Sequence, residues 1–188
     1  MFSLPCSKGG SIDPDGFIDA DGTIYVTYKI DGNSIGNGGN CGNSVKPIVP
    51  TPIMLQKMKK DGVTPDGAPV QILDRSDVDG PLVEAPSLVR TSEGVYVLFF
   101  SSNCYAGSLY DVSYATATNI KGPYKKAQAP NAPLMVTGKP FGQLYSPGGA
   151  DVTPDGTKLV FHADLGTSAS TRQMYTANIK ISGHVVTI

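Results

Sequence analysis

The sequence has 188 residues and a formal net charge of −1 at pH 7, which gives no electrostatic reason to expect nucleic acid or an anionic membrane as a partner. No apolar run approaches the roughly 20 residues that a membrane-spanning helix needs. Gly (22) and Pro (15) are plentiful and charged residues make up only 16%, a composition typical of many short strands joined by tight turns.

Runs of β-branched and aromatic residues, separated by turn signals, predict most of the secondary structure. In chain order these runs are residues 24–30, 95–101, 112–117, 158–161 and 174–181. The turn signals between them include Asp21-Gly22, Glu93-Gly94, Asp155-Gly156 and Ser182-Gly183. Helical periodicity is weak, and its best case, residues 52–60, is ambiguous. An all-β fold is therefore expected.

An internal repeat is visible when Gly22, Gly94 and Gly156 are aligned. Each turn follows a strand that begins with a proline motif, and the three motifs are Asp13-Pro14, Glu84-Ala85-Pro86 and Ser146-Pro147-Gly148-Gly149. The chain advances 71 residues from the first acid to the second and 63 more to Pro147. A period of this size holds four short strands, the unit of a propeller blade. We expect three blades, near residues 11–80, 81–140 and 141–188, within one partial propeller domain over residues 1–188.

Asp13 and Glu84 are the catalytic candidates that this repeat indicates. The first strand of each propeller blade lines the central channel, so equivalent positions on neighbouring blades converge on one mouth. Asp13 lies 9 residues before its turn glycine and Glu84 lies 10 before its own, which predicts two carboxylates facing one pocket. The residues alone leave a second interpretation open, in which each acid caps a turn or accepts a hydrogen bond from a neighbouring backbone amide.

These motifs resemble those of glycoside hydrolase family 43, a family of five-bladed propellers. The stretch from Ser11 to Tyr25 is similar to the family's third-blade motif, and the stretch from Val83 to Ser101 to its fourth-blade motif. Gly122-Pro123-Tyr124 and Ser146-Pro147-Gly148-Gly149 follow in the family's order. The resemblance covers nearly the whole chain and implies the C-terminal three blades of an inverting hydrolase of arabinan, arabinoxylan or xylan. The alternative is a catalytically silent fragment that at most binds carbohydrate.

The resemblance also implies roles for the two acids. Glu84 matches the general acid that protonates the departing glycosidic oxygen. Asp13 matches the carboxylate that orients this acid and keeps its pKa raised, because a nearby negative charge favours the protonated form. The general base is an aspartate of the family's first blade, which this chain does not contain. Asp151 lies on the inner strand of the third repeat, where we expect a channel-lining polar residue rather than a replacement base.

Four further residues are candidates for substrate binding. Arg172 resembles the family's last-blade arginine, which reaches the substrate and the carboxylates, although an ordinary surface arginine has the same local pattern. His162 follows an apolar run and either faces the channel or forms a structural hydrogen bond. Phe17 and Tyr105, like Tyr110, offer stacking faces for a sugar ring, with core packing as the other interpretation.

No cofactor is expected to be required, and no metal ligands are assigned. In the family a histidine associated with a central metal ion often follows Pro-Gly, and Gly149 stands at that position here. The resemblance therefore leaves a central calcium ion in question.

The cysteines fit no metal-ligand spacing and leave two interpretations open. One is a disulfide between Cys41 and Cys104 with Cys6 unpaired, and the other is three unpaired thiols. No signal peptide is recognisable at the start of the sequence, but the full-length parent is expected to be secreted. Three blades cannot close a ring, so self-association through open blade edges is expected.

Overall fold

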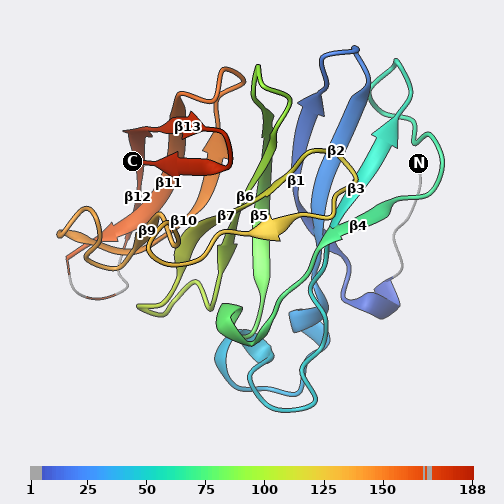
Figure 1. Cartoon of the computed structure of the whole chain (residues 1–188). Coiled ribbons are helices and arrows are strands. Elements are labelled where there is room, and N and C mark those ends of the chain that lie inside the picture. The colour runs from blue at the N-terminus through green and yellow to red at the C-terminus, as the bar shows by residue number, and fades with distance from the viewer. Residues whose placement is uncertain (1–5, 167, 169–170) are drawn as a thin grey trace.

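The computed structural model describes residues 6–166, 168 and 171–188. Its strands form three antiparallel sheets that stand side by side as successive blades, with a short hairpin at the C-terminal end (Figure 1). The helical elements of the described residues are the 3-10 turns η1 (Cys6–Lys8), η2 (Gly32–Ile35), η3 (Asn40–Gly42) and η4 (Asp77–Asp79). Within this part of the chain, no helix has the length and apolar character to cross a membrane. The prediction of an all-β fold is confirmed.

Each sheet is built from strands that are consecutive in sequence. The first contains β1 (Ser11–Ile18), β2 (Ile24–Ile30), β3 (Ile53–Met58) and β4 (Val70–Leu73). The second contains β5 (Val83–Arg90), β6 (Tyr96–Ser102), β7 (Asp111–Ala117) and β8 (Lys125–Lys126), with β9 (Met135–Val136) also paired to β7. The third contains β10 (Leu144–Val152), β11 (Lys158–Leu165) and β12 (Arg172–Asn178), and the terminal hairpin is β13 (Lys180–Ser182) with β14 (Val185–Thr187).

Two segments differ from the simplest sequence expectation. The ambiguous residues 52–60 contain strand β3, because pairing with β2 on one side and β4 on the other satisfies their backbone groups. The expected strand 174–181 is interrupted at Ile179, after which β13 turns away. The terminal hairpin then contacts the second sheet, where the Val186 amide donates to Tyr114 Oη at 3.2 Å.

Strand β6 joins the two parts of the core. Tyr96, Leu98 and Phe100 pack into the cluster shared with the first sheet, whereas Val97 and Phe99 pack into the cluster shared with the third. Side chains alternate across a strand, so both faces of β6 are buried. This explains the uninterrupted apolar run in the sequence, since strands covered on both faces lose the apolar–polar alternation.

The inner strands β1, β5 and β10 share a distortion at the proline motif. In each strand the register with its neighbour shifts there, and the residue before proline has a left-handed φ, namely Asp13 (54°), Ala85 (49°) and Ser146 (49°). The structure therefore aligns Asp13 with Ala85, and Glu84 lies one residue earlier in its strand. Asp13 and Glu84 therefore occupy neighbouring rather than identical positions of the aligned strands. The irregularity in each strand redirects the side chains beside it.

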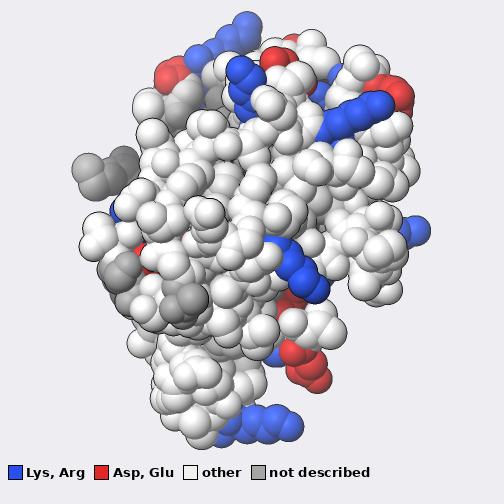
Figure 2. Space-filling model, turned by 90° about the vertical axis from the view of Figure 1, so that its left-hand side faces the viewer, with Lys and Arg blue, Asp and Glu red and all other residues white. Residues whose placement is uncertain are grey.

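The outer side of the third sheet has a broad area without charged side chains, as Figure 2 shows. Met174 of β12 is among the exposed apolar residues of this sheet. No strand of the described residues pairs with the outer edge of β12.

Candidate active site

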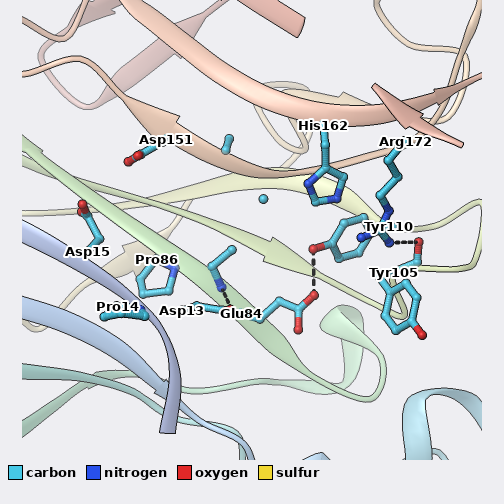
Figure 3. Close-up of a pocket in the computed structure, with 13 residues that line it drawn as sticks. Asp13, Pro14, Asp15, Glu84, Pro86, Tyr105, Tyr110, Asp151, His162 and Arg172 are labelled. Atoms are coloured by element: carbon cyan, nitrogen blue, oxygen red, sulfur yellow. Dashed lines mark hydrogen bonds between the residues drawn. The ribbon is translucent and has the colours of Figure 1, made fainter. Parts of the chain in front are cut away.

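An open pocket of about 410 Å³ lies against the inner strands of all three sheets. Its polar lining includes Asp13, Asp15, Glu84, Tyr105, Tyr110, Asp151, His162 and Arg172. Figure 3 shows two groups of side chains, with Asp15 and Asp151 toward one end and Glu84, Tyr110, His162 and Arg172 toward the other. The sequence prediction that Asp13 and Glu84 face one pocket agrees with this placement.

Both carboxyl oxygens of Glu84 have a hydrogen-bond donor. Tyr110 Oη donates to Oε1 at 2.7 Å, and Lys29 Nζ donates to Oε2 at 3.0 Å. The Glu84 side chain is 13% exposed, so it reaches the pocket from a largely enclosed position. Burial raises the pKa of Tyr110 well above its usual range, and the charge of Glu84 raises it further, which keeps the phenol protonated as a donor.

Lys29 is a site residue that the sequence analysis did not identify. It is 0% exposed, and its ammonium also lies 3.0 Å from Asp31 Oδ1. The only available signal was a lysine inside the otherwise β-branched and aromatic run from Ile24 to Ile30. Such a residue is compatible with a solvated edge as well as with a buried ion pair, so its role depends on the tertiary contact.

Asp13 connects the first two inner strands while it lines the pocket. Its Oδ2 accepts a hydrogen bond from the Ala85 amide at 3.0 Å, as the second interpretation of the sequence anticipated. Burial raises the pKa of Asp13, and the charge of Glu84 acts in the same direction, while the Ala85 amide and Lys29 oppose the increase. The two candidate acids are thus coupled electrostatically.

Asp15 and Asp151 form a second acidic group in the pocket. Asp15 Oδ2 accepts from the Leu88 amide at 3.1 Å, and Ser87 Oγ donates to Asp151 Oδ1 at 2.7 Å. Burial raises the pKa of Asp15 to about 6, and the charge of Asp151 contributes. Asp151 lines the pocket as expected, whereas Asp15 was not identified from the sequence.

His162 lies over the glycines of the third proline motif. Its ring stacks on Tyr110 with centroids 6.0 Å apart and an interplanar angle of 17°. A Cβ at Gly149 would lie 2.6 Å from His162 Cε1, and one at Gly148 would overlap the Tyr110 ring. Both glycines are therefore needed for these rings to occupy their positions. Burial lowers the pKa of His162, as does Arg172, so the imidazole is neutral near pH 7.

Arg172 and Tyr105 form part of the rim of the pocket. The guanidinium lies 4.8 Å from the centre of the Tyr105 ring, and Arg172 Nη2 donates to the Tyr105 carbonyl at 3.3 Å. Tyr105 is 51% exposed, which leaves aromatic surface available to a ligand. The preceding residue, Cys104, forms a disulfide with Cys41, so the expected pairing of these two cysteines is confirmed.

Phe17 does not reach this pocket. It is 8% exposed and packs edge-on against Tyr96, with ring centroids 6.3 Å apart, in the core shared by the first two sheets. The expectation that Phe17 stacks on a sugar is corrected accordingly. Its position follows the irregularity at Asp13-Pro14, beyond which β1 directs this ring toward the core.

The donor set of the pocket does not fit a central calcium ion. Calcium prefers six to eight oxygen ligands. Among the residues that the structure describes, no group of three or more His, Cys, Asp and Glu side chains is arranged to hold a metal. We derive no chemical step through a metal.

The fold and the acidic pocket match the class of propeller-fold glycoside hydrolases. The family model described as Glycosyl hydrolases family 43 matches residues 2–183, and the chain belongs to this family. No match was found among curated proteins.

Solved structures give the same result. A thermostable family-43 glycoside hydrolase is 25% identical with a TM-score of 0.74, and the match covers 95% of this chain and 57% of that one. An endo-1,4-β-xylanase from Bacteroides thetaiotaomicron is 29% identical with a TM-score of 0.72, covering 95% and 58%. An arabinanase from Bacillus subtilis, 22% identical with a TM-score of 0.66, covers 94% and 56% and supports the fold alone. The chain thus spans little more than half of these proteins.

Proposed function

We propose that this chain carries the acid side of an inverting glycosidase that acts on arabinose- or xylose-containing polysaccharides or oligosaccharides. The observation that carries the proposal is the shared pocket of Asp13 and Glu84, with Glu84 fixed by Tyr110 and Lys29. The name of a similar solved protein at 29% identity, an endo-1,4-β-xylanase, supports xylose-containing substrates.

Glu84 is proposed as the general acid. It donates its proton to the glycosidic oxygen as the bond to the anomeric carbon breaks, which prevents an alkoxide from forming. Asp13 is proposed to orient Glu84 and, through its negative charge, to favour the protonated acid. In an inverting hydrolase a base carboxylate about 6.5–9.5 Å from the acid takes the proton of the attacking water. We propose that this base comes from outside the chain.

Arg172, Tyr105 and His162 are proposed to bind the sugar. The Arg172 guanidinium offers paired donors for hydroxyl groups, and the exposed Tyr105 ring offers a face for the C–H groups of a sugar. Neutral His162 lines the pocket beside them and is proposed to contact the sugar through its ring. These three residues line the same pocket as the acids.

The test uses xylo- and arabino-oligosaccharides, whose sugar leaving groups require protonation. The purified chain is incubated with and without azide, a small nucleophile that can take the place of base-activated water. The proposal predicts little hydrolysis alone and, with azide, a glycosyl azide of inverted configuration, detected by NMR. Glu84→Gln abolishes this product because the amide has no acidic proton to donate. Product formation that is unchanged by Glu84→Gln refutes the acid role.

The second candidate is a catalytically silent fragment that binds carbohydrate. This candidate is kept because the matches cover only 57% and 58% of two related solved structures. Saturable sugar binding without any azide product, in the chain and in Glu84→Gln alike, supports this candidate.

Two further properties are part of the proposal. A disulfide is typical of an oxidising compartment, so Cys41–Cys104 favours secretion of the full-length parent. The outer edge of β12, with which no described strand pairs, lies beside exposed Met174 and favours self-association of the isolated chain. Light scattering tests the second point, and a monomer over a wide range of concentrations refutes it.

A further inference from the structure

Lys29 is a completely buried cation directly behind Glu84. It belongs to β2 in the first sheet, whereas Glu84 stands near the start of β5 in the second. Its Nζ is 3.0 Å from Glu84 Oε2 and 3.0 Å from Asp31 Oδ1. An ammonium without partners at such a site would cost several kcal/mol. The two carboxylates therefore compensate its charge.

Glu84 faces titratable or charged groups from several elements. Lys29 and Tyr110 contact its carboxyl group, and the charges of Asp13 and His162 interact with it. Asp31 contacts Lys29 on its other side, and the other titratable or charged groups that share the pocket are Asp15, Tyr105, Asp151 and Arg172. Lys29 is the cation in direct contact with the carboxyl group. Arg172 is exposed and its described hydrogen bond goes to the Tyr105 carbonyl. Lys29 is consequently the cation in contact with the negative charge that Glu84 acquires on losing its proton.

We propose that Lys29 is a positioning residue that holds Glu84 Oε2 and stabilises the carboxylate formed during proton transfer. This inference rests on the proposed function of Glu84. The proton passes from Glu84 to the glycosidic oxygen, which keeps the electron pair of the broken bond, and Glu84 becomes an anion. Water supplies the oxygen for the anomeric carbon and gives its proton to the external carboxylate base. A cation already in place stabilises the new anion without reorganisation.

The chain provides a matched control for the loss of a buried ion pair. Lys126 Nζ pairs with Asp79, and Lys126 also donates to the Asp74 carbonyl at 2.8 Å. Neither Lys126 nor Asp79 lines the pocket of Glu84. Lys126→Met therefore removes a comparable structural contact, whereas Lys29→Met removes the cation from Glu84.

Carboxyl titration by NMR tests the inference without any hydrolysis assay. Glu84 and Glu93 are the only glutamates in the sequence, so selective ¹³C labelling of glutamate carboxyl groups yields two signals. Glu93 is exposed in the turn between β5 and β6 and serves as an internal reference. In Lys29→Met we expect the titration midpoint of Glu84 to rise by about one pH unit or more, because the stabilising cation is lost. Glu93 stays unchanged, and Lys126→Met moves neither signal.

An unchanged Glu84 midpoint in folded Lys29→Met overturns the proposal. Should Lys29→Met fail to fold, the reciprocal experiment labels the lysine Cε atoms and compares the unmodified chain with Glu84→Gln. The midpoint of Lys29 is then expected to fall while that of Lys126 stays constant, and no change at Lys29 overturns the proposal. If the midpoints show that Lys29 and Glu84 interact but no glycosyl azide forms, the proposed function of Glu84 is refuted while the ion pair remains established.

Discussion

The Tyr110 hydroxyl donates a 2.7 Å hydrogen bond to Glu84 Oε1, joining residues 26 positions apart in the sequence. The Tyr110 ring occupies the space above Gly148 and stacks on His162. The position of the candidate acid therefore depends on a chain of contacts that reaches the third inner strand.

Tyr110→Phe removes the hydroxyl and keeps the stacked ring. A hydrogen bond to a charged group contributes about 1.5–3 kcal/mol, so we expect the free energy of unfolding to fall by about that amount. Urea denaturation measures it. Tyr175→Phe is the matched control, because the Tyr175 hydroxyl makes only an exposed 3.4 Å contact to Gln173. Equal losses in the two variants would contradict a special role for the Glu84 contact.

Gly149→Ala is expected to displace His162. The added Cβ would lie 2.6 Å from the imidazole, and φ at Gly149 is +57°, so both a clash and backbone strain result. Gly138→Ala separates the two effects, since Gly138 has φ +75° with open space around its Cβ position. The left-handed backbone alone costs about 1–2 kcal/mol. We expect Gly149→Ala to lose more stability than Gly138→Ala and to shift the His162 NMR signals; equal losses with unchanged His162 signals argue against the steric account.

Asp111→Asn is expected to stabilise the chain at alkaline pH. Burial raises the pKa of Asp111 to about 7, despite hydrogen bonds from the Ser102 amide and the Ser102 and Ser113 hydroxyls. The folded state thus binds this proton more tightly than the unfolded state, whose pKa is near 3.8. The associated stability is present below pH 3.8 and is lost as the pH rises through about 7.

Because asparagine cannot ionise, the advantage of Asp111→Asn grows between pH 5 and pH 8 and reaches a few kcal/mol. Thermal melts across this range measure the difference. Asp155→Asn in an exposed turn is the control, since hydrogen bonds from Thr153 and Thr157 lower the pKa of Asp155. An advantage of Asp111→Asn that does not vary with pH would show that burial of its charge is not the cause.

Cys104→Ser is expected to destabilise the chain and loosen the rim of the pocket. The disulfide with Cys41 spans 63 residues of sequence, for which the loop-closure model gives about 4 kcal/mol. Tyr105 directly follows Cys104, so its signals should broaden as well. Denaturation and NMR test both effects, with Cys6→Ser as the variant that keeps the disulfide. If Cys104→Ser alters stability and the Tyr105 signals as little as Cys6→Ser does, the bridge has no structural role.

The blades were predictable from the sequence because their signals are local. Glycine turns and apolar runs recur at blade spacing, and the run from Val95 to Phe100 reflects a strand buried on both faces. The counts from the turn glycines already differ by one residue between Asp13 and Glu84, but the backbone irregularity before each proline could not be read from the sequence. Spacing could not choose between a disulfide and free thiols for Cys41 and Cys104.

Side-chain destinations across sheets were the part that could not be predicted. Lys29 resembles any strand lysine until Glu84 and Asp31 are placed beside it. Asp15 acquires its raised pKa from burial and from Asp151, which is far away in the sequence. Phe17 was misassigned because its count from a turn does not reveal which way the ring points after the irregularity in β1.

The most direct test of the central claim is a sugar titration of the glutamate-labelled chain. Xylo- and arabino-oligosaccharides are added separately while the ¹³C carboxyl signals of Glu84 and Glu93 are recorded. The account predicts that at least one sugar shifts Glu84 saturably and leaves Glu93 unchanged, and that Arg172→Ala weakens the response. Saturable sugar binding that leaves Glu84 unmoved, or no binding by either sugar class, would contradict the assignment of this pocket as the carbohydrate site.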